Sequence, residues 1–555
     1  MPDNFARVNI GVVLCSWGDQ ISVTRFHVTT VTRAHPRFNW FLMCRMTGIF
    51  SYLSKVFFVG LIVLVTLMLI RTLTYPSQQP NVGQCSPSDA DFIKLTDAMI
   101  SNFQEILQIK TIAWSSSNIM LAEIKQVHHL LEKSYPHIHS SKFIKREVVN
   151  TYSLLYTVQG SDPSLKPYLL MGHMDVVPVD DQIWEVPPFE GRIKDGYLYG
   201  RGTIDNKNTI VGIMEALEFR LKSGNPPHRS FFIGLGHDEE VSGHQGAEAI
   251  SKVLAARTED LQFLLDEGMT VLKGVLDWVE PAVALIGVAE KGAVTLNVSV
   301  EDIPSGHSSM PGKESNIGVL AKALSRIEQN QHPVMFGRGP EKALLEALAP
   351  EAAFPLKFVL TNLWFFSPLV TWFLSQKPST NAAIRTTSSV TMVGGGTKIN
   401  VLPPAAWGVI NHRIHPAQSI QTVIEYDRKL ISDPRVKIQQ REEWDIDPAP
   451  ISPYGDEVFG YQVIARSLKQ VFPTALIAPG MSIGNTDTKF YWNMTKQIYR
   501  VCPTFMLPSD LQRFHGINER ISLINLQETI NFYYHVMVNA DAATTMPKHS
   551  HVEEL

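Results

Sequence analysis

Apolar positions along this chain follow two different periods. Short apolar runs bounded by turn residues predict buried strands, whereas apolar residues three or four positions apart predict helices. The predicted strands cover 153–158, 167–171, 230–235 and 261–265, and the predicted helices cover 209–221 and 246–254. Because these strands and helices alternate, we expect an α/β fold with a doubly wound, largely parallel sheet.

The pattern changes near residue 290. The elements predicted beyond it are strands at 293–300, 388–392 and 407–414, and helices at 316–329 and 525–538. We expect an α+β lid or dimerisation domain at 291–415, inserted into a catalytic domain that spans 89–290 and 416–540. The far boundary is open, because either domain could own a predicted helix at 419–431. Residues 541–555 have the composition of a frayed tail.

The amino end differs from the rest of the chain. Its run 56–70 is apolar, carries no charge and is flanked by basic residues. Its length suits the core of a signal peptide and falls short of the roughly 20 residues of a spanning helix. We predict a signal peptide or signal anchor at 49–71, between an extension at 1–48 and a Pro- and Ser-rich linker at 72–88.

Charge in the extension predicts the orientation of this segment. Arginine outnumbers acidic residues in 1–48, which favours a cytoplasmic amino end and export of the body. We therefore expect a secreted protein, with a single-pass anchor as the alternative and a buried core helix as a third interpretation. The sequons Asn297-Val-Ser and Asn493-Met-Thr agree with export.

Composition excludes several classes of protein. The chain has 555 residues, a formal net charge of −4 and four cysteines. The chain has no excess of basic residues, so its charge does not indicate nucleic-acid binding. The cysteines, at 15, 44, 85 and 502, are too few for a disulfide scaffold and lack CxxC spacing. At most one bridge, Cys85 to Cys502, could form in the folded part.

One segment of the insert is unusually aromatic. It runs from 354 to 373 and contains Trp364, Phe365, Phe366, Trp372 and Phe373. Two interpretations are open: core of the lid or a dimer face, or a wall for an apolar substrate.

Histidines and carboxylates fall at the ends of predicted strands or in the loops beyond them. A set of imidazoles and carboxylates suits Zn²⁺, and Mn²⁺ or Co²⁺ less well. One carboxylate shared by two ions gives the arrangement of two-metal hydrolases. The residues concerned are His173, Asp175, Asp205, Glu239, Glu240, Asp266 and His515.

The motifs around these residues carry a resemblance. GHMDVVP, YGRGTIDNKN, GHDEEVSG, LLDEG, SGHSSMP and FHGINE together resemble the motif series of the di-zinc aminoacylase/carboxypeptidase family, over about 90–540. The resemblance implies a metallopeptidase-like catalytic domain with two zinc ions per chain. It also implies a strained cis peptide after Asp205, where Asn206 stands in place of a frequent Asp.

The resemblance further implies a role for each residue. His173 and Asp266 would bind one zinc ion, Glu240 and His515 the other, and Asp205 would bridge them. Asp175 would orient the ring of His173. Glu239 would be the general base, and His307 would stabilise the oxyanion from the lid. Arg413, and less strongly Arg385, would bind the carboxylate of the substrate.

The implied function is hydrolysis of an amide beside a free carboxylate. The sequence resembles most the branch of the family that reversibly hydrolyses and condenses N-fatty-acyl amino acids. The expected small-molecule partners are therefore fatty acids, amino acids and their conjugates. A homodimer through the lid is also implied. The alternative is a di-zinc exopeptidase acting on small peptides. A binding protein on an inactive peptidase fold would lack ligands or base, and a membrane scaffold would explain only the apolar run.

Overall fold

The computed structural model of the protein describes residues 37–180, 182–258, 260–276, 278–441 and 445–542, with side chains from residue 52 onward. The chain divides into two units, Met1–Leu67 and Met68–Leu555. In the first unit the described residues form helix α1 (Arg37–Thr74), which continues into the second unit. Tyr52–Thr74 is long and apolar enough to cross a membrane. Most of the predicted extension at 1–48 lies outside the described residues.

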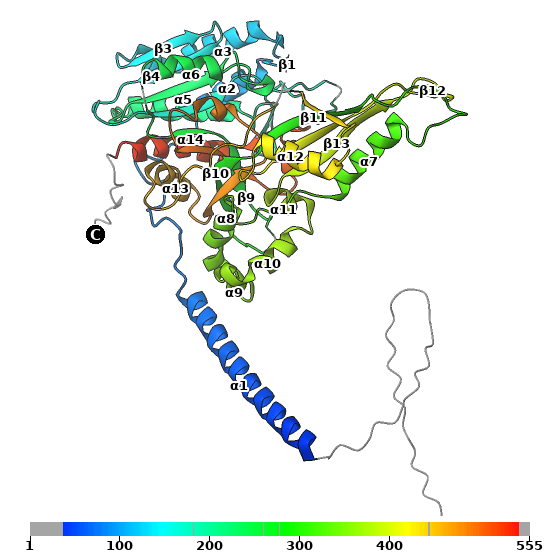
Figure 1. Ribbon diagram of the computed structural model, residues 1–555. Helices are drawn as coiled ribbons and strands as arrows, with labels where there is room; N and C mark the ends of the chain where they lie inside the picture. Colours follow the sequence, from blue (N-terminus) through cyan, green and yellow to red (C-terminus); the bar gives the residue numbers. More distant parts are fainter. Residues whose placement is uncertain (1–36, 181, 259, 277, 442–444, 543–555) are drawn as a thin grey trace, which may run out of the picture. The chain divides into compact units, whose positions relative to one another are not determined.

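A mixed eight-stranded sheet forms the centre of the catalytic domain (Figure 1). β5 lies parallel to both β8 and β9, whereas β3 and β4 add an antiparallel edge. The prediction of an α/β sheet is confirmed. In spatial order its strands are β17 (Leu476–Ser482), β10 (Val283–Glu290), β18 (Ile498–Met506), β9 (Leu264–Leu272), β5 (Tyr168–His173), β8 (Phe231–Gly236), β4 (Ser153–Val158) and β3 (Ile144–Val149).

Helices cover both faces of this sheet. Because successive strand residues point to opposite faces, Leu170 joins one apolar core and Leu169 the other. The first core packs against α2 (Asp97–Gln108), α3 (Leu121–Ser134), α5 (Lys207–Lys222), α13 (Phe459–Val471) and α14 (Leu523–Ala540), and the second against α6 (Ala247–Ala255).

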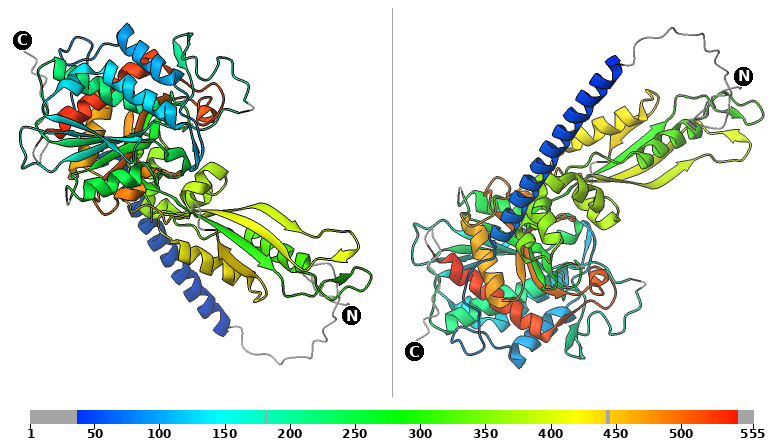
Figure 2. Two further views of the ribbon diagram at one scale, coloured as in Figure 1. Left: turned by 90° about the horizontal axis from the view of Figure 1, so that it is seen from above. Right: turned by 90° about the horizontal axis from the view of Figure 1, so that it is seen from below.

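The insert contains its own antiparallel sheet, which extends away from the catalytic domain (Figure 2). Its strands in order are β13 (Thr387–Gly395), β15 (Ala406–Ile414), β11 (Gly292–Val300) and β16 (Lys437–Gln440). Helices α7 (Asn316–Gln329) and α12 (Ile420–Ile431) pack on this sheet. The expected end of the insert at 415 is therefore too early, because β16 pairs with β11.

Four α-helices lie between α7 and β13 in the insert: α8 (Glu341–Leu348), α9 (Leu356–Thr361), α10 (Leu363–Leu374) and α11 (Pro378–Ala383). The aromatic segment forms α9 and α10, and Trp364, Phe365, Trp372 and Phe373 are exposed. These four side chains therefore do not belong to a lid core.

Smaller elements complete the chain. They are β1 (Ala113–Ser115), β2 (Asn118–Ile119), α4 (Pro136–Ser140), β6 (Ile193–Lys194), β7 (Tyr197–Tyr199), β12 (Gly306–His307), β14 (Val401–Leu402) and β19 (Arg520–Ser522). The linker beyond Thr74 packs on the catalytic domain: the side chain of Gln79 exchanges two hydrogen bonds with the backbone of Ile477. Cys85 and Cys502 are both free thiols, so the bridge considered above does not form.

Candidate metal centre and active site

The carboxyl ends of β5 and β8 and the middle of the neighbouring strand β9 bring the candidate ligands together. His173 is the last residue of β5, Glu239 and Glu240 lie in the turn after β8, and Glu267 lies in β9. Asp205 precedes α5, next to β5. Ligand sites of α/β sheets form at this edge because the loops there converge.

Asp205 lies between two imidazoles. Its Oδ1 is 2.9 Å from Nε2 of His173, and its Oδ2 is 2.8 Å from Nε2 of His515. A carboxylate that offers one oxygen to each side has the geometry of a ligand shared by two ions. The arrangement supports the predicted bridging position of Asp205.

One further carboxylate completes each half of the centre. Glu267 Oε1 is 3.2 Å from Nε2 of His173, and Glu240 Oε2 is 3.4 Å from Nε2 of His515. In each of the sets His173–Asp205–Glu267 and Asp205–Glu240–His515, the ligand atoms lie within 4.8 Å of one another. Each set can hold one ion.

In the structure Glu267, and not the predicted Asp266, contacts His173 in the first set. The two residues are adjacent in β9, at a point where the register with β18 shifts between Asp266 and Met269. Oδ2 of Asp266 is buried without a hydrogen-bond partner among the described residues. The motif LLDEG places two acidic residues at the strand end but does not say which one faces inward.

Asp175 fixes both the ring of His173 and the glutamate turn. Its Oδ1 is 3.2 Å from Nδ1 of His173, which leaves Nε2 of that ring for the centre. Its carboxylate also accepts backbone hydrogen bonds from Glu239 and Glu240, at 3.2 and 3.0 Å. The structure thus gives Asp175 a second positioning contact that the sequence did not reveal.

The electrostatics of the site demand cations. Burial is the main cause that raises the pKa of Glu239, Glu240 and Glu267, and each is also raised by a neighbouring carboxylate; for Glu240 the pKa rises to about 7. Carboxylates packed together away from water need compensating positive charge to stay ionised. Divalent metal ions supply that charge, and imidazole nitrogens with carboxylate oxygens are a suitable ligand set.

The loop that carries Asp205 contains a cis peptide bond and is hydrogen-bonded to β9. The peptide bond between Asp205 and Asn206 is cis, as the resemblance implied. The Asn206 side-chain amide donates to Oε2 of Glu267 at 2.7 Å, so Asn at this position fixes the neighbouring carboxylate.

Glu519 is a positioning residue that sequence reasoning missed, although it lies in the motif FHGINE. Its Oε1 accepts backbone hydrogen bonds from Gly202, Ile204 and Asp205, at 3.0, 2.7 and 3.3 Å. Its Oε2 accepts from Arg201 at 2.7 Å, in a fully buried ion pair. Glu519 therefore ties the bridging carboxylate to the segment that carries His515.

Glu519→Gln should lower the free energy of unfolding by about 3 kcal/mol, because it leaves Arg201 as a buried charge without its partner. Glu185→Gln, which removes one partner of an exposed ion pair with Lys194, should leave the free energy of unfolding nearly unchanged, because solvent screens this pair. Urea unfolding followed by circular dichroism measures both values. Equal stabilities of the two variants would contradict the anchoring role of Glu519.

Comparison with known proteins assigns the chain. Residues 169–539 match Peptidase family M20/M25/M40. The chain belongs to this family.

Individual members of the M20 family agree with the geometry. The chain is 42% identical over 515 residues to the N-fatty-acyl-amino acid synthase/hydrolase PM20D1 of Xenopus tropicalis, covering 92% of this chain and 99% of that protein. It is 32% identical over 460 residues to carboxypeptidase S of Saccharomyces cerevisiae, covering 75% and 78% of the two chains. The M20 family metallo-carboxypeptidase Sso-CP2 from Sulfolobus solfataricus shares the fold, with a TM-score of 0.56 at 16% identity, covering 80% of this chain and all of that one.

An apolar pocket opens beside the metal centre of this M20 enzyme. It has a volume of about 570 Å³ and includes Asp205, Glu239, Glu240, Glu267 and His515 in its lining. The rest of the wall is largely apolar: Met269, Leu272, Met481, Ile483, Met506, Leu511 and Phe514. None of the aromatic residues of α10 is among its lining residues, so the wall comes from β9, β17, β18 and the loop before β19.

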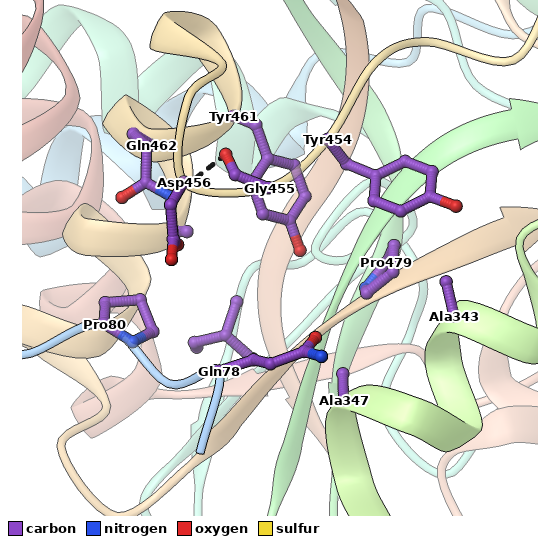
Figure 3. A pocket seen from close by; sticks show the side chains of 12 residues that line it. Gln78, Pro80, Ala343, Ala347, Tyr454, Gly455, Asp456, Tyr461, Gln462 and Pro479 are labelled. Atoms are coloured by element: carbon purple, nitrogen blue, oxygen red, sulfur yellow. Dashed lines mark hydrogen bonds between the residues drawn. The ribbon is translucent and has the colours of Figure 1, made fainter. Parts of the chain in front are cut away.

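A second pocket, of about 340 Å³, has a different character (Figure 3). Gln78 and Pro80 of the linker close it against Tyr454 and Tyr461. It contains one carboxylate, Asp456, and no histidine. Its lining offers no ligand set for a metal ion, which leaves the first pocket as the candidate active site.

The two candidate arginines lie in different surroundings. Arg413 is exposed on β15, near Lys291, whose pKa is lowered to about 8 by burial and then by the charge of Arg413. The backbone of Lys291 is hydrogen-bonded to Ser482 and Asn485, which line the apolar pocket. Arg385 instead donates to the carbonyl of His332 within the insert. The surroundings favour Arg413.

His307 does not reach the metal centre within this chain. It is exposed in β12, which pairs with β14 and lies at the far end of the insert (Figure 1). Its Nδ1 contacts Oγ of Ser309 at 2.7 Å. The expectation that His307 covers the site of its own chain is therefore not met in this structure, because the insert sheet carries it away.

Proposed function

We propose that the chain is a zinc-dependent amidohydrolase that hydrolyses and condenses N-fatty-acyl amino acids. The observation that carries the proposal is the apolar pocket that opens directly on the two ligand sets. The names of the PM20D1 relatives support the same substrate class. A fatty acyl chain would occupy the apolar wall while the scissile carbonyl lies at the cluster.

Two zinc ions held by His173, Glu267, Asp205, Glu240 and His515 would supply Lewis acidity and activate water. Glu239 takes the proton of the attacking water and delivers it to the departing amine nitrogen. Asp175 keeps the ring of His173 and the glutamate turn in place during this transfer. In the condensation direction the same groups act in reverse order.

Arg413 would bind the free carboxylate of the amino-acid part, with Arg385 as the weaker candidate. The exposed guanidinium of Arg413 has no carboxylate partner among the ion pairs of the described residues. It lies near Lys291, whose backbone is hydrogen-bonded to residues of the pocket wall. A guanidinium suits a carboxylate because two of its N–H groups match the two oxygens.

The deciding experiment incubates the purified full chain with zinc and N-oleoyl-phenylalanine and follows release of phenylalanine. Release supports the proposal. Cleavage of small dipeptides such as Gly-Leu without cleavage of the acyl amino acid would favour the exopeptidase alternative, which the similarity to carboxypeptidase S supports.

Met269→Trp should shorten the acyl chain that the enzyme accepts, because the indole would fill part of the apolar pocket. Since each buried methylene contributes about 0.8 kcal/mol, loss of room for two methylenes should reduce kcat/KM for an oleoyl substrate by roughly tenfold. An acetyl substrate should be unaffected. Met392→Trp, on exposed β13, serves as the control. Equal losses for both acyl lengths would contradict this use of the pocket.

We also propose that His307 acts in the site of a second copy, through a homodimer formed by the insert. Its exposure at the far end of the insert supports this role. His307→Ala and Glu239→Gln should each be inactive, whereas random dimers formed by co-expressing both variants should recover about a quarter of parent activity. Absence of any recovery would assign His307 to its own chain or to no catalytic role.

For location, we propose that the body lies outside the cytoplasm and stays attached through α1, the alternative to secretion. Met68 and Thr72, in the last turns of α1, are buried against the insert, at 3% and 2% exposure. Cleavage after the apolar run would remove these contacts. Retention of the chain in membranes washed with alkaline carbonate tests the proposal, and release into the wash would favour secretion.

A further inference from the structure

Helix α10 exposes a row of large apolar side chains. Trp372 and Phe373 are 60% and 68% exposed, and Trp364, Phe365 and Leu369 are similarly uncovered. These positions are spaced by four residues in two adjacent rows, 364–372 and 365–373, so they share one side of the helix. Leu363 and Val370 are buried on the other side. The exposed residues Trp364, Phe365, Leu369, Trp372 and Phe373, with exposed Phe354 before α9, are called the aromatic surface.

The segment that carries the aromatic surface contains basic residues and no acidic residue. Between residues 352 and 377 the sequence contains Lys357 and Lys377 and no Asp or Glu. Tryptophan and phenylalanine on one side of a helix, with nearby lysines, are typical of segments that lie in a membrane interface. A water-facing surface of this composition would be unfavourable.

The end of the candidate membrane helix packs beside the aromatic surface. Thr72 Oγ1 lies 2.9 Å from Thr361 Oγ1, and the Asn362 amide donates to the carbonyl of Met68 at 3.3 Å. Arg71 Nε donates to the carbonyl of Thr361 at 2.7 Å. Thr361 ends α9 and Asn362 precedes α10, so the last turns of α1 are joined to the junction of these two helices.

The connection onward from α1 is also held to the body. Ser77 donates to Glu351 at 3.0 Å, Gln79 pairs with the backbone of Ile477, and Cys85 N donates to the carbonyl of Gln470 at 3.0 Å. A chain tied at these points leaves little freedom for the body to turn away from the end of α1. The carboxyl end of the candidate span, Met68–Thr74, therefore lies next to the junction of α9 and α10.

We propose that the aromatic surface docks onto the lipid bilayer that α1 crosses. The aromatic side chains enter the interfacial region of the outer leaflet, and Lys357 and Lys377 face its phosphates. The body then rests on the bilayer instead of projecting from it. This inference rests on the proposed attachment through α1 and goes beyond the proposed activity, since it concerns which surface contacts the bilayer and not which bond is cleaved.

The test uses the full chain reconstituted in vesicles of phosphatidylcholine and phosphatidylglycerol, with or without brominated acyl chains that quench nearby tryptophan. The fluorescence lost in Trp364→Phe/Trp372→Phe gives the emission of those two residues, and Trp114→Phe/Trp407→Phe gives that of two tryptophans exposed elsewhere. We expect brominated lipid to quench the first pair at least twofold and the second pair not at all. Equal, weak quenching of both pairs would overturn the proposal.

A second variant separates docking from a contact between copies. Leu369→Asp/Phe373→Asp changes exposed side chains, so the fold should persist. In vesicles this variant should lose quenching of Trp364 and Trp372 by at least half while its oligomeric state, measured by chemical cross-linking, stays that of the parent. Suppose instead that the variant changes its oligomeric state and that lipid quenches its Trp364 and Trp372 no differently than in the parent. That result would show that a second copy covers the surface. These readouts do not depend on any activity, so failure of the proposed function leaves them intact.

Discussion

Glu239→Gln should reduce kcat by about 10²- to 10⁴-fold, the range that a positioned general base contributes. Glu239 is partly buried, and its carboxylate lies in one group with the ring of His173 and the carboxylate of Glu240, whose ligand atoms are within 4.8 Å of one another. It is not needed to complete either of the two ligand sets. The amide keeps the size of the side chain and removes its ability to accept a proton.

The measurement is release of phenylalanine from N-oleoyl-phenylalanine, with metal content determined on the same samples. Metal content of the variant should equal that of the parent, because the ligand sets are intact. Glu190→Gln, an exposed glutamate of the same domain, should keep parent activity. Retention of activity by Glu239→Gln within about threefold would exclude Glu239 as the base.

Asp205→Ala should abolish activity and metal binding together. Its two oxygens lie 2.9 and 2.8 Å from the two imidazoles, so both sets lose a ligand at once. Parent protein stripped with a chelator should regain activity when zinc is added, and the variant should not. Elemental analysis after dialysis measures the bound metal.

A matched pair of variants tests the same centre at β9. Glu267→Gln should lose about one metal ion per chain, because it withdraws a charged ligand from the set with His173. Asp266→Asn should retain both ions, since its carboxylate belongs to neither of the two ligand sets. The reverse result would restore Asp266 as the ligand and remove Glu267.

Local sequence determined the elements and most of the centre. The short apolar runs gave β4, β5 and β8 nearly residue by residue, because a strand buried on both faces needs an unbroken apolar run. His173, Glu239 and Glu240 could be found since they follow such runs directly. The resemblance to the family then implied that Asp205 and His515 share a site, and the structure brings them together although they are 310 positions apart.

Tertiary structure alone decided the remaining points. The local geometry of β9 brings Glu267 within 3.2 Å of His173, where the sequence predicted Asp266, and the pairing of β16 with β11 moved the end of the insert beyond 415. The role of Glu519 depends on three backbone N–H groups over 300 positions away, which no local pattern encodes. The sequence left the aromatic segment open between a lid core or dimer face and a wall for an apolar substrate, because apolar composition does not state what covers a helix. Its exposure appears only once the opposite side of α10 is seen to be packed.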